Sequence, residues 1–188
     1  MRNIEEILKE ANAWHEGHTE FRNGMHGDGW LQKDLIARDP KYLDQVARLQ
    51  ADQIMREFPE VELIMGPVTG GALIASNVAR HLGKEMGIID GKKDPVVFHD
   101  MNIPEAGEKV VMVEDIISSG VDMGRFTRFL KQSGAEILGI CVWMNRKGSE
   151  IENIKVSSLL ETPFKLYQKE ECPLCAQGVE IKYKNVRE

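Results

Sequence analysis

Two acidic residues, Glu114 and Asp115, directly follow the apolar run VVMV at 110–113, and a turn of small residues occupies 118–120. Adjacent carboxylates accept hydrogen bonds in pairs, so they suit the vicinal hydroxyls of a ribose or a metal ion that bridges them. Small residues ahead of a helix expose free backbone amides, and the helix dipole behind them favours an anion. We interpret the acids and the turn together as a cradle for ribose 5-phosphate. The alternative, a strand end with two solvated acids, stays open at this point.

A second small-residue turn, GPVTGG at 66–71, also follows an apolar run. It is not a Walker P-loop, because Ala72 follows where a lysine and a hydroxyl residue would be required. Neither turn fits the G-x-G-x-x-G pattern of dinucleotide-binding proteins. One such turn is often only a tight connection between a strand and a helix. Two of them in one chain, one beside paired acids, indicate a site for anions.

The elements that must position these turns alternate along the chain. Strands are predicted at 61–65, 96–98, 109–113 and 136–144, with later strands at 156–160 and 164–168. Helices are predicted at 4–14, from Asp39-Pro40 onward, at 72–82 before Gly83, and at 121–133 before Gly134. Residues 15–30 contain four glycines and predict an irregular loop or a hairpin. This alternation predicts a parallel α/β sheet, in which ligands bind beyond the carboxyl ends of the strands.

Composition narrows the class of protein. A chain of 188 residues is enough for one α/β domain. Its net charge of -6, with no basic stripe, argues against nucleic-acid binding. No apolar segment has the length of a membrane span, and the charged amino terminus MRNIEEILKE lacks the apolar core of a signal peptide, so we expect no membrane association. Three cysteines are too few for a disulfide framework. We therefore expect the protein to be located in the reducing environment of the cytoplasm.

The stretch VVMVEDIISSG resembles the phosphoribosyl-pyrophosphate signature of type I phosphoribosyltransferases. Further segments resemble orotate phosphoribosyltransferases over nearly the whole chain: GMHGDGWLQKDLIARDP, GPVTGGALIASNVARHLG, MNRKG and CPLCAQGVEI. The resemblance implies a single domain over 1–188, with a central parallel sheet flanked by helices. It also implies a small hood formed by N-terminal and C-terminal segments, about 15–35 and 160–188.

The resemblance implies a reaction as well. Ribose 5-phosphate would pass from phosphoribosyl pyrophosphate to orotate, giving orotidine 5'-phosphate and pyrophosphate, a step of pyrimidine nucleotide biosynthesis. Magnesium would bridge pyrophosphate and ribose through substrate and water, without a protein ligand. A homodimer is implied too. The resemblance implies that the ribose hydroxyls bind to Glu114 and Asp115, and that the base binds to Lys33 and Arg146. The 5-phosphate would bind to Ser118, Ser119, Gly120, Val121 and Asp122. Pyrophosphate would bind to Val68, Thr69, Gly70 and Gly71.

Arg146 would pair with the carboxylate of orotate, which a planar guanidinium fits with two hydrogen bonds. In the family the pyrophosphate turn contains a non-proline cis peptide. The protein would mainly position the reactants and stabilise charge as pyrophosphate leaves.

The chain departs from the family in the interval 87–109. Relatives carry there a loop rich in Lys and Arg that covers the leaving pyrophosphate. This chain has His99 and Asp100 where short-looped relatives have a pair of cations. Lys92 and Lys93 are the remaining mid-loop cations, and we name them candidate catalytic residues beside the two acids. A merely solvated lysine pair is the open alternative.

Asp122 is a second departure, since relatives have a small or hydroxyl residue in this turn. A carboxylate about 4 Å from a phosphate costs on the order of 1 kcal/mol in water. Asp122 must therefore point away, meet magnesium or weaken the site.

Cys172 and Cys175 have the spacing of half a zinc site, but no second cysteine pair lies near them in the sequence. Zinc would need ligands from elsewhere in the chain or from a partner chain. We expect His15, His18 and His26 to be surface or hydrogen-bonding residues rather than metal ligands.

Two other functions stay open. A loop poor in arginine would suit a non-catalytic relative that binds phosphoribosyl ligands and regulates another process. Arg146 could also pair with another acceptor, which would make the protein a phosphoribosyltransferase for a different base.

Overall fold

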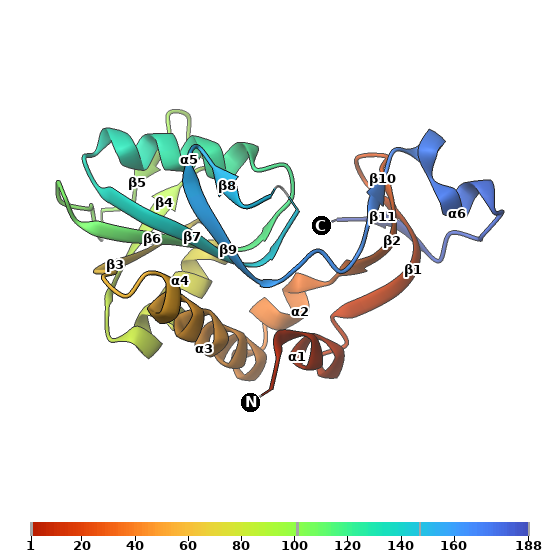
Figure 1. Ribbon diagram of the computed structural model, residues 1–188, viewed down its shortest axis with the longest axis horizontal. Coiled ribbons are helices and arrows are strands. Elements are labelled where there is room, and N and C mark those ends of the chain that lie inside the picture. Colours follow the sequence, from red (N-terminus) through yellow and green to blue (C-terminus); the bar gives the residue numbers. More distant parts are fainter. Residues whose placement is uncertain (1, 101, 147, 188) are drawn as a thin grey trace.

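The computed structural model describes residues 2–100, 102–146 and 148–187. Its strands form two sheets. The larger sheet has the strand order β5-β4-β3-β6-β7-β9-β8, and the smaller one has the order β10-β2-β1-β11. Figure 1 shows the larger sheet between helices at one end of the molecule and the smaller sheet at the other. The expected central parallel sheet with flanking helices is therefore confirmed.

The larger sheet has a parallel centre. It consists of β3 (Leu63–Pro67), β4 (Glu85–Asp90), β6 (Lys109–Ile117), β7 (Glu136–Asn145) and β9 (Ile154–Leu160). The edge strands β5 (Val97–Phe98) and β8 (Glu150–Ile151) run antiparallel to their neighbours. The stretch 110–113 of β6 is fully buried, because helices cover both faces of the sheet.

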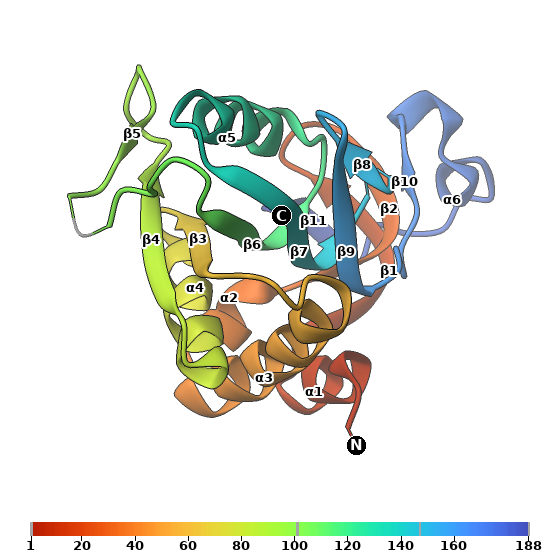
Figure 2. The same ribbon diagram turned by 60° about the vertical axis from the view of Figure 1, so that its left-hand side comes forward.

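Three helices cover this sheet, α5 (Val121–Gln132) on one face and α3 (Pro40–Glu57) and α4 (Gly70–Leu82) on the other (Figure 2). Asp39 caps α3 by accepting a hydrogen bond of 2.9 Å from the amide of Lys41. Gly83 ends α4 in the left-handed conformation, with φ 62°. Each face thus has its own apolar core.

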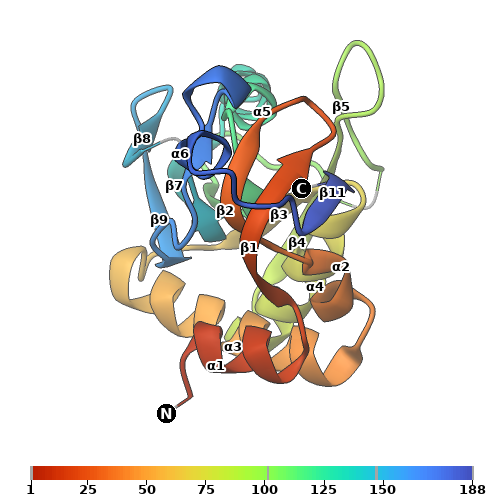
Figure 3. The ribbon, with the colours of Figure 1, turned by 90° about the vertical axis from the view of Figure 1, so that its right-hand side faces the viewer.

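The smaller sheet, which we call the hood sheet, joins the two ends of the chain. Strands β1 (Trp14–Phe21) and β2 (His26–Leu31) form an antiparallel hairpin, so the second of the two alternatives for 15–30 is confirmed. Strand β10 (Leu166–Tyr167) pairs with β2, and β11 (Tyr183–Val186) pairs with β1. The short elements η1 (Lys169–Glu171) and α6 (Pro173–Ala176) connect them (Figure 3).

Several predicted boundaries were wrong. The first helix, α1 (Ile4–Glu10), does not reach Trp14, because Asn12 takes a positive φ of 53° and the chain turns into β1. Strand β6 does not end on Glu114 and Asp115. Its pairing with β7 continues to Ile117, which is the last residue of the strand.

Several short elements were not predicted: the strands β4, β8 and β11, and the helices α2 (Lys33–Ala37), η1 and α6. Each has six residues or fewer, too few for a clear periodic pattern. Among the described residues, no helix has the length and apolar character needed to cross a membrane.

Candidate functional site

A cavity of about 560 Å³ lies beyond the carboxyl ends of β3 and β6, at the start of α5. It brings together most residues that the sequence singled out. Those that line it are Lys33, Val68, Thr69, Gly70, Lys92, Glu114, Asp115, Ser118, Ser119, Gly120, Val121 and Asp122. Gly71, Lys93 and Arg146 are not among the described residues that line it.

The two acids lie within β6, shortly before the strand ends at Ile117. The Glu114 carboxylate accepts a hydrogen bond of 3.0 Å from the amide of Asp115. The Asp115 carboxylate accepts hydrogen bonds from the amide of Ile116 at 2.6 Å and from Lys33 Nζ at 2.8 Å. Asp115 is therefore buried but not unpaired, and its partner is the lysine that was expected at the base.

Burial and the negative charge of Asp115 raise the pKa of Glu114 to about 8. Burial alone would lower the pKa of Lys33, but the charge and hydrogen bond of Asp115 outweigh it and the net shift is upward. At neutral pH Lys33 is thus charged and Glu114 holds a proton. The acid pair carries one negative charge, which Lys33 balances.

The glycine turn at 66–71 packs directly against these acids. A Cβ atom on Gly70 would lie 3.3 Å from Asp115 Oδ2, and one on Gly71 would lie 3.1 Å from Glu114 Oε2. A Cβ on Gly66 would lie 2.1 Å from the carbonyl oxygen of Gly71, which no side chain can do. The small residues keep this turn against the acid pair, and the amide of Val68 donates a hydrogen bond of 2.9 Å to the carbonyl oxygen of Ile89. The peptide bond between Val68 and Thr69 is cis, as the resemblance implied.

The serine turn precedes α5 and supplies a different set of donors. Gly120 is the N-cap residue of α5 with φ 75°, and no side chain caps the helix. The first amides of α5 are therefore free of side-chain partners, apart from a long contact of 3.4 Å from the amide of Val121 to Ser119 Oγ. Two serine hydroxyls and these amides can bind an anion at the positive end of the helix dipole.

Asp122 lies in the first turn of α5. Its side chain is 79% exposed, and its carboxylate lies 3.9 Å from the guanidinium of Arg125. Solvent and this cation both screen its charge. Among the outcomes expected for Asp122, the structure therefore favours a carboxylate turned toward solvent, although the residue still borders the cavity.

The structure separates the two lysines of the loop after β4. Lys92 Nζ donates a hydrogen bond of 3.0 Å to Thr69 Oγ1, which places it at the glycine turn. Lys93 Nζ lies 3.6 Å from an oxygen of Asp90, and its side chain is mostly exposed. Arg125 fixes this loop by donating hydrogen bonds to the carbonyl oxygens of Gly91 and Lys93.

The two base-side candidates are also apart. Lys33 lies in the cavity, whereas Arg146 donates a hydrogen bond of 3.5 Å to the carbonyl oxygen of Phe164. Lys147, in the same MNRKG segment, lies outside the described residues. Arg187, which sequence reasoning missed, lines the cavity together with Asp34. No local motif marks Arg187, since it follows β11 and reaches the cavity only through the pairing of the hood sheet.

The model of the phosphoribosyl transferase domain matches residues 33–168 of the chain. The chain belongs to the phosphoribosyltransferase family. The match covers both turns, the acid pair and the lysines of the loop after β4.

Curated relatives cover nearly the whole chain. An orotate phosphoribosyltransferase of Nitratiruptor sp. is 31% identical, over 94% of this chain and 95% of the relative. An orotate phosphoribosyltransferase of Thermotoga maritima is 29% identical, over 94% of each chain.

Solved structures show the same fold at lower identity. The orotate phosphoribosyltransferase of Aeropyrum pernix superposes with a TM-score of 0.66 at 16% identity, covering 84% of this chain and 93% of that one. The adenine phosphoribosyltransferase of Saccharomyces cerevisiae gives a TM-score of 0.67 at 23% identity, covering 83% and 99%. The fold of a phosphoribosyltransferase therefore does not distinguish between these two bases.

Proposed function

We propose that the protein is an orotate phosphoribosyltransferase. It transfers the 5-phosphoribosyl group of phosphoribosyl pyrophosphate to orotate and releases pyrophosphate and orotidine 5'-phosphate, within pyrimidine nucleotide biosynthesis. The observation that carries the proposal is the convergence of an acid pair, a serine turn and a glycine turn on one cavity. The choice of orotate rests on the relatives that match the chain from end to end.

Each wall of the cavity has one task in this proposal. Glu114 and Asp115 accept hydrogen bonds from the ribose hydroxyls, and the amides and hydroxyls of 118–122 hold the 5-phosphate. The turn at 68–71 holds pyrophosphate. Lys92 stands at that turn and balances the charge that develops on pyrophosphate as the bond to the anomeric carbon breaks.

The donor set of the cavity fits magnesium. The described residues that line it offer carboxylate, hydroxyl and carbonyl oxygens and no histidine or cysteine, which is the chemistry that Mg²⁺ prefers. When bound between ribose and pyrophosphate, the ion would neutralise the charge of the leaving group. Glu114 and Asp115 would act on the sugar beside it.

The acceptor base needs cations on the open side of the cavity. Lys33 and Arg187 line the cavity, and Arg146 follows β7 in the MNRKG segment, which resembles the base-side turn of the family. We assign Arg146 to the carboxylate of orotate and Lys33 to the base. Lys33 must then leave Asp115, or share it, when the sugar binds. We further propose that the protein is a homodimer, on the basis of the family. We also propose that it is cytoplasmic, on the basis of the family and of its three free cysteines.

One observation favours a second function. The loop after β4 places one cation, Lys92, at the glycine turn, which suits a protein that binds phosphoribosyl ligands without turnover. A spectrophotometric assay with orotate, phosphoribosyl pyrophosphate and magnesium separates the two. Turnover that Asp115→Asn abolishes supports the enzyme, whereas tight nucleotide binding without turnover supports the regulator. Turnover with adenine, hypoxanthine or uracil but none with orotate would reassign the base.

A further inference from the structure

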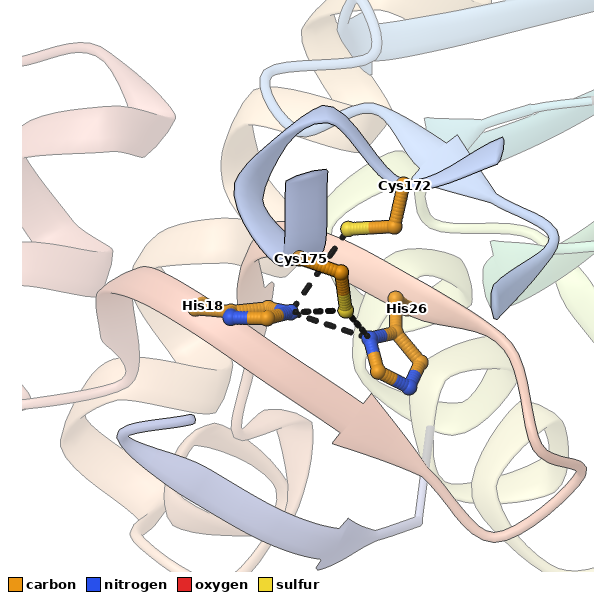
Figure 4. Close-up of side chains that lie close together, drawn as sticks. All are labelled: His18, His26, Cys172 and Cys175. Carbon is orange, nitrogen blue, oxygen red and sulfur yellow. Dashed lines mark hydrogen bonds between the residues drawn. The ribbon is translucent and has the colours of Figure 1, made fainter. Parts of the chain in front are cut away.

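Four side chains that can bind a metal ion meet in the hood, away from the cavity (Figure 4). They are His18 of β1, His26 at the start of β2, Cys172 just before α6, and Cys175 within α6. One ligand atom from each lies within 4.8 Å of all the others. His18 and Cys172 are 154 residues apart in the sequence, so the cluster joins the two ends of the chain.

Four of the six distances between these atoms are close to the edges of a tetrahedron around zinc. Bond lengths of about 2.0 Å to nitrogen and 2.3 Å to sulfur give edges of about 3.3 Å between two nitrogens and about 3.6 Å between nitrogen and sulfur. His18 Nε2 lies 3.6 Å from both sulfur atoms, and His26 Nδ1 lies 3.3 Å from Cys175 Sγ. The two nitrogens lie 2.9 Å apart, a few tenths of an ångström closer than zinc requires. The two remaining distances, from Cys172 Sγ to Cys175 Sγ and to His26 Nδ1, are at most 4.8 Å. Small shifts of the two rings and of Cys172 would therefore bring the four atoms to tetrahedral spacing.

A second contact orients His18 for binding. Its Nδ1 lies 2.7 Å from the carbonyl oxygen of Val179, which can only accept a hydrogen bond. The proton of the neutral ring is therefore on Nδ1, and the lone pair of Nε2 points at the sulfur atoms. Metal-bound histidines are usually held in this way by a backbone carbonyl or a carboxylate.

Burial distinguishes the cluster from surface histidines and cysteines. His18, His26 and Cys172 are each 2% exposed or less, and Cys175 lies on the solvent side, where an ion can enter. Two thiols and two imidazoles in such a place have few hydrogen-bond partners besides one another. A cation that binds all four atoms satisfies them at once.

We propose that the chain binds one Zn²⁺ through His18 Nε2, His26 Nδ1, Cys172 Sγ and Cys175 Sγ. Mixed imidazole and thiolate ligands in a tetrahedron select zinc over magnesium, calcium and manganese. Binding releases the protons of the two thiols, so Zn²⁺ and two thiolates form a neutral centre. With four protein ligands, the site has no open position for a substrate and is structural.

The structural need for such a site is visible in the hood sheet. Strand β10 has two residues and β11 has four, so few ladder hydrogen bonds attach the carboxyl end of the chain to the hairpin. Zinc fixes α6 to both strands of that hairpin. Arg187, which follows β11, and Lys33, which follows β2, both line the cavity, so the ion holds together the elements that carry these two cations.

Metal analysis of the purified protein tests the proposal directly. Elemental mass spectrometry of protein expressed with zinc should give about one zinc per chain, and Cys175→Ser and His26→Asn should lower this at least about fivefold. His15→Gln is the matched control. His15 lies on β1, as His18 does, but it hydrogen-bonds Gln32 and is outside the cluster. The His15→Gln variant should therefore keep its zinc.

A second measurement covers variants that fold poorly. Wild-type protein stripped of metal under reducing conditions and given Co²⁺ should show the absorption of a tetrahedral ion with thiolate charge-transfer bands. Added Zn²⁺ alone should raise the melting temperature of the stripped wild type by several degrees and leave that of Cys175→Ser unchanged. Wild-type protein that contains no metal and binds neither ion with reduced thiols would overturn the proposal. A disulfide between Cys172 and Cys175 in freshly isolated protein would overturn it as well.

Discussion

The two sheets of this molecule hold their functional groups in different ways. In the larger sheet, the acid pair lies within β6 and the two turns directly follow β3 and β6, central strands that helices bury on both faces. In the hood sheet, two strands from each end of the chain meet, and two of the four are very short. The side of the cavity proposed for the phosphoribosyl group is therefore built from strands that helices bury on both faces. The side proposed for the base depends on contacts between distant segments.

This difference predicts where substitutions act. A change in the larger sheet should reduce the chemistry while the protein stays folded. A change in the hood should first lower the stability of the protein and the affinity for the acceptor base.

The largest effect is expected at the acid pair. Asp115→Asn removes the charge that holds the ribose in the proposed complex, and kcat with orotate should fall about 100- to 1,000-fold. Asp122→Asn is the matched control, since this carboxylate borders the same cavity but is largely exposed, and kcat should change less than about threefold. Equal losses in the two variants would contradict the separate roles given to these carboxylates.

The two lysines of the loop after β4 should differ next. Lys92→Met removes the cation at Thr69, and kcat should fall roughly 10- to 100-fold because charge on the leaving pyrophosphate is left unbalanced. Lys93→Met changes the same charge one residue away and should lower kcat less than about twofold. Steady-state kinetics on both variants decides the matter, and a larger loss in Lys93→Met would show that the loop closes differently on substrate.

The raised pKa of Glu114 should make stability depend on pH. The pKa rises from its ordinary value of 4.5 to about 8 on folding, so the folded protein holds this proton more tightly than the unfolded chain. The stability from this proton is complete below about pH 4.5, falls as the pH rises, and is lost above about pH 8. Glu114→Gln should remove this fall.

Urea unfolding at about pH 5, 7 and 9 measures the effect. The free energy of unfolding of Glu114→Gln should exceed that of the wild type by on the order of 2 kcal/mol at the highest pH. The two free energies should differ least at the lowest pH. Glu150→Gln, on the exposed edge strand β8, should keep the wild-type profile. Parallel curves for the wild type and Glu114→Gln would contradict the buried, protonated carboxyl.

The smallest effect is expected at Gly120. Its φ of 75° makes Gly120→Ala cost about 1 kcal/mol of stability, and displacement of the turn should also weaken binding of ribose 5-phosphate. Gly83→Ala, with φ 62° and open space around its Cβ, should cost a similar amount of stability without lowering that affinity. Calorimetric titration of both variants with ribose 5-phosphate shows whether only the Gly120 turn contributes to phosphate binding.

The same contrast explains what could be read from the sequence. Strands, turns and helices of the larger sheet follow one another along the chain, so local periodicity and small-residue turns predicted them, and with them the residues around the cavity. Short elements such as α2 and β4 lack enough periodic residues to be seen.

The missing parts of the site all depend on contacts between distant residues. Lys33 and Asp115 are 82 residues apart, and their ion pair has no local signal. His18 and His26 were expected to be surface or hydrogen-bonding residues, and they are hydrogen-bonded and buried. Their place beside Cys172 and Cys175 was not predicted, because β1 and β2 reach these cysteines only by pairing with the carboxyl end of the chain. The C-x-x-C spacing predicts half of the proposed metal site, and only the fold brings the two histidines to it.

The most direct test is a crystal structure of the protein with ribose 5-phosphate. The sugar hydroxyls should lie within hydrogen-bonding distance of Glu114 and Asp115, the phosphate on the amides of 118–122, and Lys33 Nζ away from its present place at Asp115. A sugar bound elsewhere, with Lys33 still paired to Asp115, would contradict the account.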